Sequence, residues 1–294
     1  MKEKLIAFAG TAVLSASAGT AFAGNIGAIE EDAPIAMVQN DQPSPIGYVE
    51  LNFGMRSFDT DRDGDYDEVR SPSLSGQTFA RVGDLVLEFQ ASLSGDTDGG
   101  SDSDINASLG AFGHYLFETD LGMFGTFAGV TGGAENATSD GNYWGVLGVE
   151  YANGGFVASL GTARHSSTET GSQVAESFNY ASASYEHKVS DALGVSAEGY
   201  FGDLNAFDTD EDGTFGQLSV AISYDLNDHI GFKAGVTKFV LDEDDDPDSG
   251  AAGTELSLGV SVALGGSNSA ARSAIPFDTP DLHRPLTWSS EAFD

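Results

Sequence analysis

The stretch that decides the fold is ELSLGVSVAL, residues 255–264. Its even-numbered positions are all Leu or Val, and its odd-numbered positions are Glu, Ser, Gly, Ser and Ala. Successive side chains of a β-strand point to opposite faces, so this stretch predicts a strand with one apolar face and one small, polar face. The same alternation recurs in residues 46–56 and 84–94 and, more weakly, elsewhere between residues 46 and 264. The sequence therefore predicts an all-β protein.

Twelve stretches of about ten residues are compatible with strands. The expected strands are 46–58, 75–82, 84–95, 104–117, 121–131, 141–151, 155–165, 174–188, 193–203, 214–224, 229–240 and 253–264. Every second junction is a short, turn-forming pair of residues, whereas the other junctions are longer. The short pairs are Gly83-Asp84, Thr119-Asp120, Asn153-Gly154, Ser190-Asp191 and Asn227-Asp228.

This asymmetry predicts a transmembrane antiparallel up-and-down β-barrel. Its short turns would face the periplasm and its long acidic loops would face outside, with about twelve strands and fourteen to sixteen as the alternative count. A soluble β-sandwich also alternates, but strands long enough to span a membrane at a tilt, and no evident second, drier sheet, favour the barrel. No stretch after the first residues approaches 18 consecutive apolar residues, so no transmembrane helix is expected there.

The two ends of the chain differ from the middle. Residues 1–23 combine early lysines, an apolar run and the small-x-small site Ala21-Phe22-Ala23, which predicts a cleaved secretory signal peptide. Residues 24–45 and 265–294 do not resemble strands, and we expect flexible periplasmic segments there. The expected domain organisation is therefore one barrel over residues 46–264 between two short segments.

Composition narrows the class of partner. The formal net charge is −34, which argues strongly against nucleic acid as a partner. The chain contains no cysteine, so it has no disulfide framework. The partners that remain are the lipid bilayer of an outer membrane, small solutes and ions.

Charged residues recur opposite the apolar faces of the expected strands. A charge facing hydrocarbon is costly, so we expect these side chains to point into the lumen. The expected pore-lining residues are Glu50, Arg56, Arg81, Glu88, Glu150, Glu198, Lys233 and Glu255. Five carboxylates against three bases favour the passage of cations. The alternative is that these groups pair inside a narrow barrel and fill it.

Two acidic stretches repeat the D-x-D-x-D-G opening of a calcium-binding loop. The candidate ligands are Asp59, Asp61, Asp63 and Asp65 in one stretch and Asp208, Asp210 and Asp212 in the other. Position twelve is Arg70 in the first and Ser219 in the second, where an EF-hand has a bidentate Glu, so these are not EF-hands. Weak Ca²⁺ binding is the only cofactor hypothesis, and a solvated acidic rim that attracts cations is its alternative.

Enzymatic activity is not expected. Outer-membrane hydrolases need a nucleophile, a base and an orienting group that converge. In the expected topology His165 lies at the base of a loop and Asp191 lies near a turn at the other end, so the two do not converge. His187 and His229 lie beside turns.

The export signal, the alternating segments and the aromatic residues at strand ends, such as Tyr143-Trp144 and Tyr180, resemble the Gram-negative outer-membrane porin superfamily, especially small alphaproteobacterial members. Stretches such as SYEHK (184–188) and AISYDL (221–226) are similar to strand ends of that group. General porins of the group are sixteen-stranded trimers with a terminal aromatic residue, so the resemblance implies a homotrimer. This chain departs from that pattern, with twelve expected strands and a last residue, Asp294, that is acidic.

The expected function is a passive, cation-preferring channel in the outer membrane for small hydrophilic solutes. The alternative is a non-conducting structural or surface-interaction barrel whose acidic loops bind Ca²⁺. Inward-facing Gly and Ser favour an open lumen, whereas large inward side chains such as Tyr48, Trp144 and Tyr200 favour a plugged one if they cluster at one height.

Overall fold

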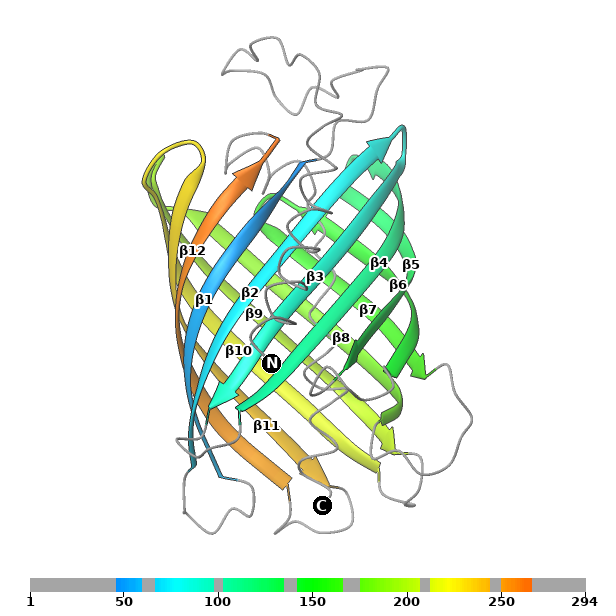
Figure 1. Ribbon diagram of the computed structural model, residues 1–294. Helices are drawn as coiled ribbons and strands as arrows, with labels where there is room; N and C mark the ends of the chain where they lie inside the picture. Colours follow the sequence, from blue (N-terminus) through cyan, green and yellow to red (C-terminus); the bar gives the residue numbers. More distant parts are fainter. Residues whose placement is uncertain are drawn as a thin grey trace.

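The computed structural model describes residues 46–59, 67–97, 103–134, 142–165, 175–206, 212–243 and 250–265. Twelve strands pair antiparallel with their sequence neighbours, and β1 also pairs with β12, so the sheet closes into a barrel (Figure 1). The strands are β1 (Ile46–Asp59), β2 (Asp67–Val82), β3 (Leu85–Thr97), β4 (Ser103–Thr119), β5 (Gly122–Ala134), β6 (Asn142–Asn153), β7 (Phe156–His165), β8 (Ala175–Lys188), β9 (Leu193–Ala206), β10 (Asp212–Asp225), β11 (Ile230–Glu243) and β12 (Gly250–Leu264). The predicted twelve-stranded up-and-down barrel is confirmed.

The five predicted short turns all join strands at one end of the barrel, which is uppermost in Figure 1 and is called the turn end below. Gly83 and Gly154 lie in two of these turns with φ angles of +64° and +60°. A tight hairpin connection needs such left-handed residues, which glycine adopts without steric cost. The first residue of β1 and the last residue of β12 lie at the same end. The opposite end is called the loop end.

Several strands extend further toward the loop end than predicted. The largest difference is in β2, which begins at Asp67, whereas the sequence predicts a start at residue 75. The polar stretch before residue 75 contains Pro72, which weakens a strand pattern because proline cannot donate to a ladder. In the structure Pro72 pairs with Phe53 of β1, while the register with β3 passes from Arg70 directly to Ser73. β2 therefore stays paired with β1 through this stretch, although its pairing with β3 is interrupted there.

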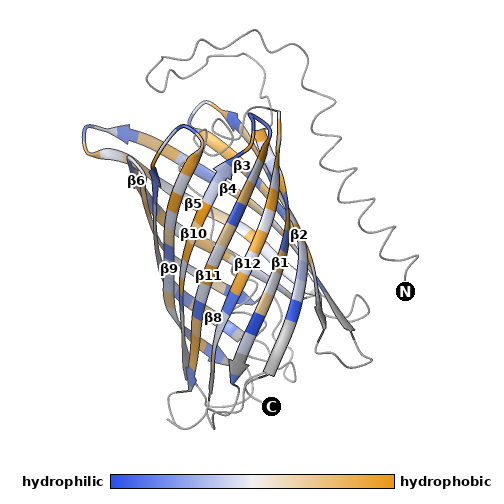
Figure 2. Cartoon of the chain, turned by 90° about the vertical axis from the view of Figure 1, so that its left-hand side faces the viewer, coloured by the Kyte–Doolittle hydropathy of each residue, from blue (hydrophilic) through white to orange (hydrophobic). Residues whose placement is uncertain are grey.

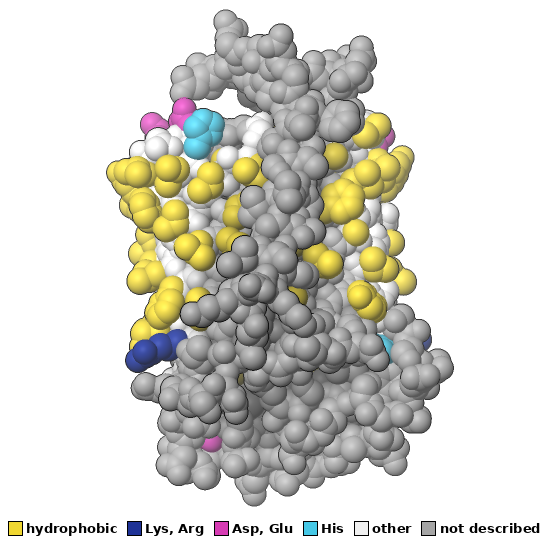
Figure 3. Space-filling view, in the orientation of Figure 1, with side chains coloured by type: hydrophobic (Ala, Val, Ile, Leu, Met, Phe, Trp, Pro, Cys, Tyr) yellow, Lys and Arg dark blue, Asp and Glu magenta, His cyan; other side chains and the backbone are white. Residues whose placement is uncertain are grey.

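The outer face of the barrel is apolar. Leu147, Leu160, Leu218 and Leu258 are each about 60 % exposed or more, and each faces away from the lumen. In Figure 3 hydrophobic side chains cover the visible flanks of the barrel, and charged side chains lie toward its margins. Figure 2 shows the alternation of apolar and polar residues along the strands that produces this surface. An exposed apolar surface of this extent is typical of a barrel that faces lipid.

Aromatic side chains gather on the outer face near the turn end. They come from β4 to β8, β10 and β11, and they are Tyr115, Phe117, Phe124, Tyr151, Phe156, Tyr185, Tyr224 and Phe232. Neighbouring rings are in contact, with centroids 5.8 Å apart for Phe117 and Phe124 and 4.9 Å apart for Phe124 and Tyr151. Such a girdle marks the level of a membrane–water interface. We call this set the turn-end girdle.

Not every predicted strand-end aromatic belongs to the outer face. Trp144 and Tyr180 point into the barrel and are 1 % and 4 % exposed, whereas Tyr143 points outward. The inward direction expected for Trp144 agrees with this placement, and the pairing register fixes the side to which each of these aromatic residues points.

Residues 1–45 and 266–294 lie outside the described residues, so the predicted signal peptide, the N-terminal segment and nearly all of the C-terminal segment are outside them too. Among the residues that the structure describes, no helix is long and apolar enough to cross a membrane.

Candidate functional site

The candidate site is the inner wall of the barrel. The pairing register places all eight predicted charged residues on this wall. They fall into two groups. Arg56, Glu88, Glu150 and Glu255 are buried, whereas the other four, which are Glu50, Arg81, Glu198 and Lys233, are partly or fully exposed.

A histidine joins two of the buried carboxylates. His114 of β4 lies with Nε2 2.8 Å from Glu88 Oε2 and with Nδ1 3.0 Å from Glu150 Oε1. Neither Glu88 nor His114 has any exposed surface. A carboxylate against each ring nitrogen is best matched by an imidazolium, in which both nitrogens donate. The three residues therefore form a compact buried ion cluster, which we call the Glu–His–Glu cluster.

Gly125 of β5 makes this cluster possible. Glu150 lies on β6 and His114 on β4, so their side chains must meet across β5. A Cβ atom at Gly125 would lie 2.6 Å from Glu150 Oε1 and 2.8 Å from Leu116 Cδ2. The bare backbone at this position leaves the path that Glu150 uses to reach His114.

Amide and phenol groups extend the cluster toward β1. Gln77 Nε2 donates a hydrogen bond of 2.6 Å to Glu88 Oε1, and Gln90 donates to the same oxygen. The hydroxyl of Tyr48 in turn donates to Gln77 Oε1 at 2.6 Å. The network therefore ties together five strands, β1 to β4 and β6, through hydrogen bonds between their inward side chains.

The other buried pair bridges the first and last strands. Arg56 Nε lies 3.5 Å from Glu255 Oε2, and the two residues are direct partners in the β1–β12 register. Both side chains are 8 % exposed. Four of the eight predicted pore-lining residues are thus held in buried ionic contacts, as the alternative reading of a filled lumen expects.

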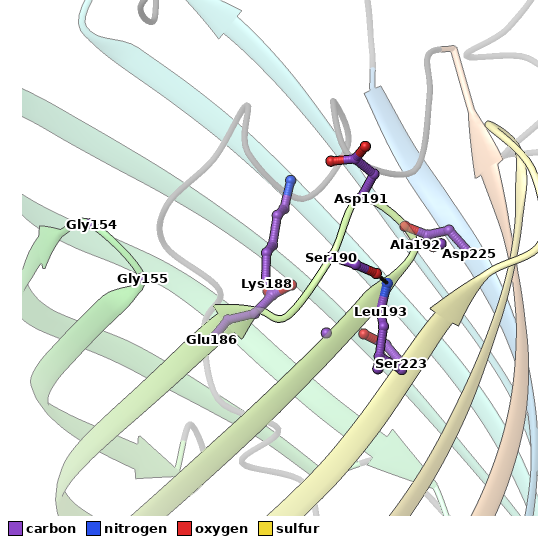
Figure 4. Close-up of a pocket in the computed structure, with 11 residues that line it drawn as sticks. Gly154, Gly155, Glu186, Lys188, Ser190, Asp191, Ala192, Leu193, Ser223 and Asp225 are labelled. Carbon is purple, nitrogen blue, oxygen red and sulfur yellow. Dashed lines mark hydrogen bonds between the residues drawn. The ribbon is translucent and has the colours of Figure 1, made fainter.

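The inner wall is more open at the turn end of β8 to β11. Glu198 and Lys233 are exposed there, and a cavity of about 290 Å³ lies at the edge of this region. Its lining includes Glu186, Lys188, Ser223 and Asp225, whose positions are labelled in Figure 4. We call this region the turn-end vestibule. Arg81 lies on another part of the same rim, where its Nε donates to Gly83 O at 3.0 Å.

Further from the turn end the inner wall is apolar. Twelve buried side chains from β4 to β11 form one cluster, which we call the apolar band. Its members are Phe112, Phe127, Trp144, Val146, Ala163, Phe178, Tyr180, Tyr200, Leu204, Phe215, Phe239 and Leu241. Trp144 and Tyr200 both belong to this band, whereas Tyr48 lies apart in the polar network. Two of the three large inward residues singled out from the sequence therefore cluster.

Several rings of the band lie against glycines of the next strand. A Cβ at Gly161 would lie 2.5 Å from Cζ of Tyr180, and a Cβ at Gly202 would lie 2.5 Å from Cε2 of Phe178. A Cβ at Gly129 would likewise lie too close to the ring of Phe112. Glycine thus lets the rings lie flat on the wall, an arrangement known from glycines paired with aromatic residues in sheets.

Gly148→Ala is expected to lower the free energy of unfolding by roughly 1–3 kcal/mol. Its new Cβ would clash with the carbonyl oxygen of Leu160 and would lie 2.5 Å from Cζ of Phe127. Gly145→Ala on the same strand is the control, because its Cβ would meet nothing closer than 4.0 Å. Urea unfolding of the two variants in lipid vesicles measures the difference. Equal stability of the two variants would contradict the close contact between ring and glycine.

The predicted Ca²⁺ ligands fall mostly outside the described residues. Asp59 ends β1 and is buried, and Asp212 begins β10. The five others, Asp61, Asp63, Asp65, Asp208 and Asp210, lie outside the described ranges. Within those ranges no group of three or more His, Asp or Glu side chains could hold a metal ion.

Sequence reasoning missed the role of His114 and the apolar band. His114, Glu88 and Glu150 share the inward parity of their strands, but only the register across β5 places them together. A signal for the band was present in residues 121–131 and 176–188, where apolar residues occupy both faces.

Comparison with solved structures identified proteins of similar architecture. An outer-membrane channel from Pseudomonas putida superposes with a TM-score of 0.53 and 14 % identity, covering 80 % of this chain and all of that one. The two chains share a fold. A porin named KdgM gives a TM-score of 0.42 at 10 % identity, covering 73 % of this chain and 99 % of the porin. Outer membrane phospholipase A from Escherichia coli gives 0.44 at 12 % identity, covering 79 % and 94 %. No family model matches the chain, and no curated protein matches its sequence.

Proposed function

We propose that this chain is an exported outer-membrane channel that lets small hydrophilic solutes pass passively, with a preference for cations. The observation that carries the proposal is a closed barrel with an apolar outer face, a turn-end girdle and a charged inner wall. The apolar face and the girdle favour a lipid environment, and the turns then face the periplasm. Export by a signal peptide cleaved after Ala23 is part of the proposal.

The preference for cations rests on acidic groups near the turn end. Glu50, Glu186, Glu198 and Asp225 project from the inner wall there, against Arg81, Lys188 and Lys233. The turns add Asp84, Asp120, Asp191 and Asp228, all of them exposed. A mouth with an excess of carboxylates concentrates cations and repels anions.

Planar-bilayer recording with a salt gradient tests the proposal. Discrete conductance steps and a reversal potential of the sign expected for cations would support it. If the protein folds and inserts into the bilayer but no variant passes current, the proposed channel function is contradicted.

Removing an acidic or a basic charge from the turn-end vestibule should shift the reversal potential in opposite directions. Glu198→Gln is expected to reduce cation preference, because it removes an inward carboxylate, and Lys233→Gln is expected to increase it, because it removes an inward base. Both residues are exposed and both substitutions are similar in size, so each variant controls for the other. Reversal potentials that move in the same direction would argue against selection in the vestibule.

A second candidate is a non-conducting barrel, whose acidic loops would bind Ca²⁺. The apolar band favours it, because a band of buried aromatic side chains is unlike the polar interior of a water-filled porin. The same recordings distinguish the two candidates.

A further inference from the structure

The turn-end vestibule contains a cavity of a size that suits a small molecule. Its volume of about 290 Å³ lies near the lower end of the range for small-molecule sites, about 300–1,000 Å³. Figure 4 shows Glu186 and Lys188 of β8 on one side of this cavity and Ser223 and Asp225 of β10 on the other. Asp191 lies in the turn between β8 and β9. We call this cavity the turn-end pocket.

The floor of the turn-end pocket is open because β9 places a glycine between two longer side chains. Lys188, Gly194 and Ser223 are partners in one row across β8, β9 and β10. A Cβ at Gly194 would lie 2.6 Å from Ser223 Oγ and 3.7 Å from Glu186 Oε1. Both oxygens therefore approach one point that carries no side chain. A donor group that enters above Gly194 can contact both of them.

Hydrogen bonds of the backbone hold the frame of the pocket. The N–H of Asp225 donates to the carbonyl oxygen of Ala192 at 2.8 Å. The N–H of Leu193 donates to Ser190 Oγ at 3.1 Å, as Figure 4 shows. The turn and β10 are thus fixed relative to each other, so a ligand does not have to order them when it binds.

The side chains that line the pocket are mainly acceptors. Glu186 and Ser223 are half-buried, and neither side chain makes a hydrogen bond or an ion pair with another residue that the structure describes. The charged groups of the lining are three carboxylates, from Glu186, Asp191 and Asp225, and one base, Lys188. The lining therefore has two negative charges in excess, which favours a ligand that brings both positive charge and donors.

We propose that the turn-end pocket binds a small aliphatic diamine as its dication. One ammonium group lies above Gly194, where it donates to Glu186 and Ser223. The second lies toward the rim beside Asp225, which is two residues beyond Ser223 on the same face of β10 and therefore about 7 Å away along the strand. A four-carbon chain between two ammonium groups spans a similar distance. Binding in the pocket is independent of the proposed function, whereas passage of the diamine rests on the proposed channel.

Charge and spacing favour a diamine over other ligands. An anion would meet three carboxylates, and a monovalent cation would leave half of the excess charge uncompensated. A divalent metal ion has the right charge, but in the described ranges no group of three or more His, Asp or Glu side chains is placed to hold one. A dication with two separated charges suits carboxylates that lie apart.

Equilibrium dialysis of 1,4-diaminobutane against the full chain, folded in detergent micelles, tests the site. We expect saturable binding of one molecule per chain. Glu186→Gln is expected to weaken this binding about tenfold or more, because it removes a charged acceptor. Lys188→Gln is expected to strengthen it, because it removes a base that repels the ligand. 1,4-Butanediol has a similar length but no charge, and it is not expected to compete. Absence of saturable binding would overturn the proposal.

Two matched controls separate the pocket from the general attraction of an acidic mouth. Glu198→Gln removes a carboxylate from the same inner wall but outside the pocket, and it should weaken binding far less than Glu186→Gln. Equal effects of these two variants would contradict the site.

The second control changes the floor and leaves the charge unaltered. Gly194→Ala should weaken binding, because its Cβ occupies the open point beside Ser223 Oγ. Gly216→Ala on the outer face of β10 should not, because its Cβ would meet nothing closer than 3.6 Å. Folded Gly194→Ala protein with full affinity would argue against the pocket, and the glutamate pair decides the question if this variant does not fold.

Bilayer recordings separate this proposal from the proposed channel. 1,4-Diaminobutane added to both sides is expected to reduce the current carried by Na⁺ in the natural chain, and to reduce it less in Glu186→Gln. Saturable binding without current in any variant keeps the pocket and removes the channel. Current without saturable binding keeps the channel and removes the pocket.

Discussion

Replacing His114 with Leu is expected to lower the free energy of unfolding by about 3–5 kcal/mol. The substitution leaves Glu88 and Glu150 buried without the group that lies between them. Removing one partner of a buried ionic contact is costly because the remaining charge has lost its compensation and cannot regain water. Urea unfolding in vesicles, followed by far-UV circular dichroism, measures the loss.

A triple variant separates charge from packing. His114→Leu combined with Glu88→Gln and Glu150→Gln has the same cavity change but no buried charge. Its stability is expected to return at least halfway to that of the natural chain, because replacing a whole buried ion cluster by neutral groups costs far less than breaking it. A triple variant less stable than His114→Leu alone would show that the cluster is not held by charge.

Val220→Lys is expected to lower the free energy of unfolding by roughly 2–4 kcal/mol if the outer face lies in hydrocarbon near mid-membrane. Val220 is 48 % exposed and lies near the centre of β10 on the apolar outer face. Ser219 is its neighbour on the inner face, where it pairs with Glu198 of β9. Ser219→Lys introduces the same side chain beside a carboxylate and is expected to be nearly neutral.

The comparison of the two lysine variants also tests the membrane assignment itself. In lipid vesicles the lysine at position 220 should cost more than the lysine at position 219. The reverse order, or equal costs, would mean that the outer face of β10 does not lie in lipid.

The sequence predicts the barrel well because alternation and turn chemistry are local. Residues 255–264 predict β12 from side-chain parity alone, and the turns at Gly83 and Gly154 follow from backbone preferences. The start of β2 was missed because Pro72 weakens a local pattern, while its compensation lies on the neighbouring strand β1. Local sequence patterns thus predict a strand less well where pairing with an adjacent strand offsets an unfavourable residue such as Pro72.

The inner wall is harder to predict because it depends on register. The inward direction of Glu88 and Glu150 follows from parity, but their contact with His114 requires the pairing of three strands and an open position at Gly125. The same holds for Tyr180, whose ring lies over Gly161 of the adjacent strand. A single sequence predicts which face of the sheet a side chain occupies, but it gives little information about the residues that the side chain contacts.

The closure of the barrel through β1 and β12 has a consequence for how the chain folds. Eleven of its twelve strand pairs join sequence neighbours, which are connected by tight turns or by longer loops, whereas the last joins Gly47 to Leu264 across the whole length of the barrel sequence. Until that seam closes, two strand edges remain open to other chains, and the slow, entropically costly step comes at the end of assembly. The Arg56–Glu255 contact lies on the seam, so it forms only at this step. The Glu–His–Glu cluster, within β3 to β6, can form before it.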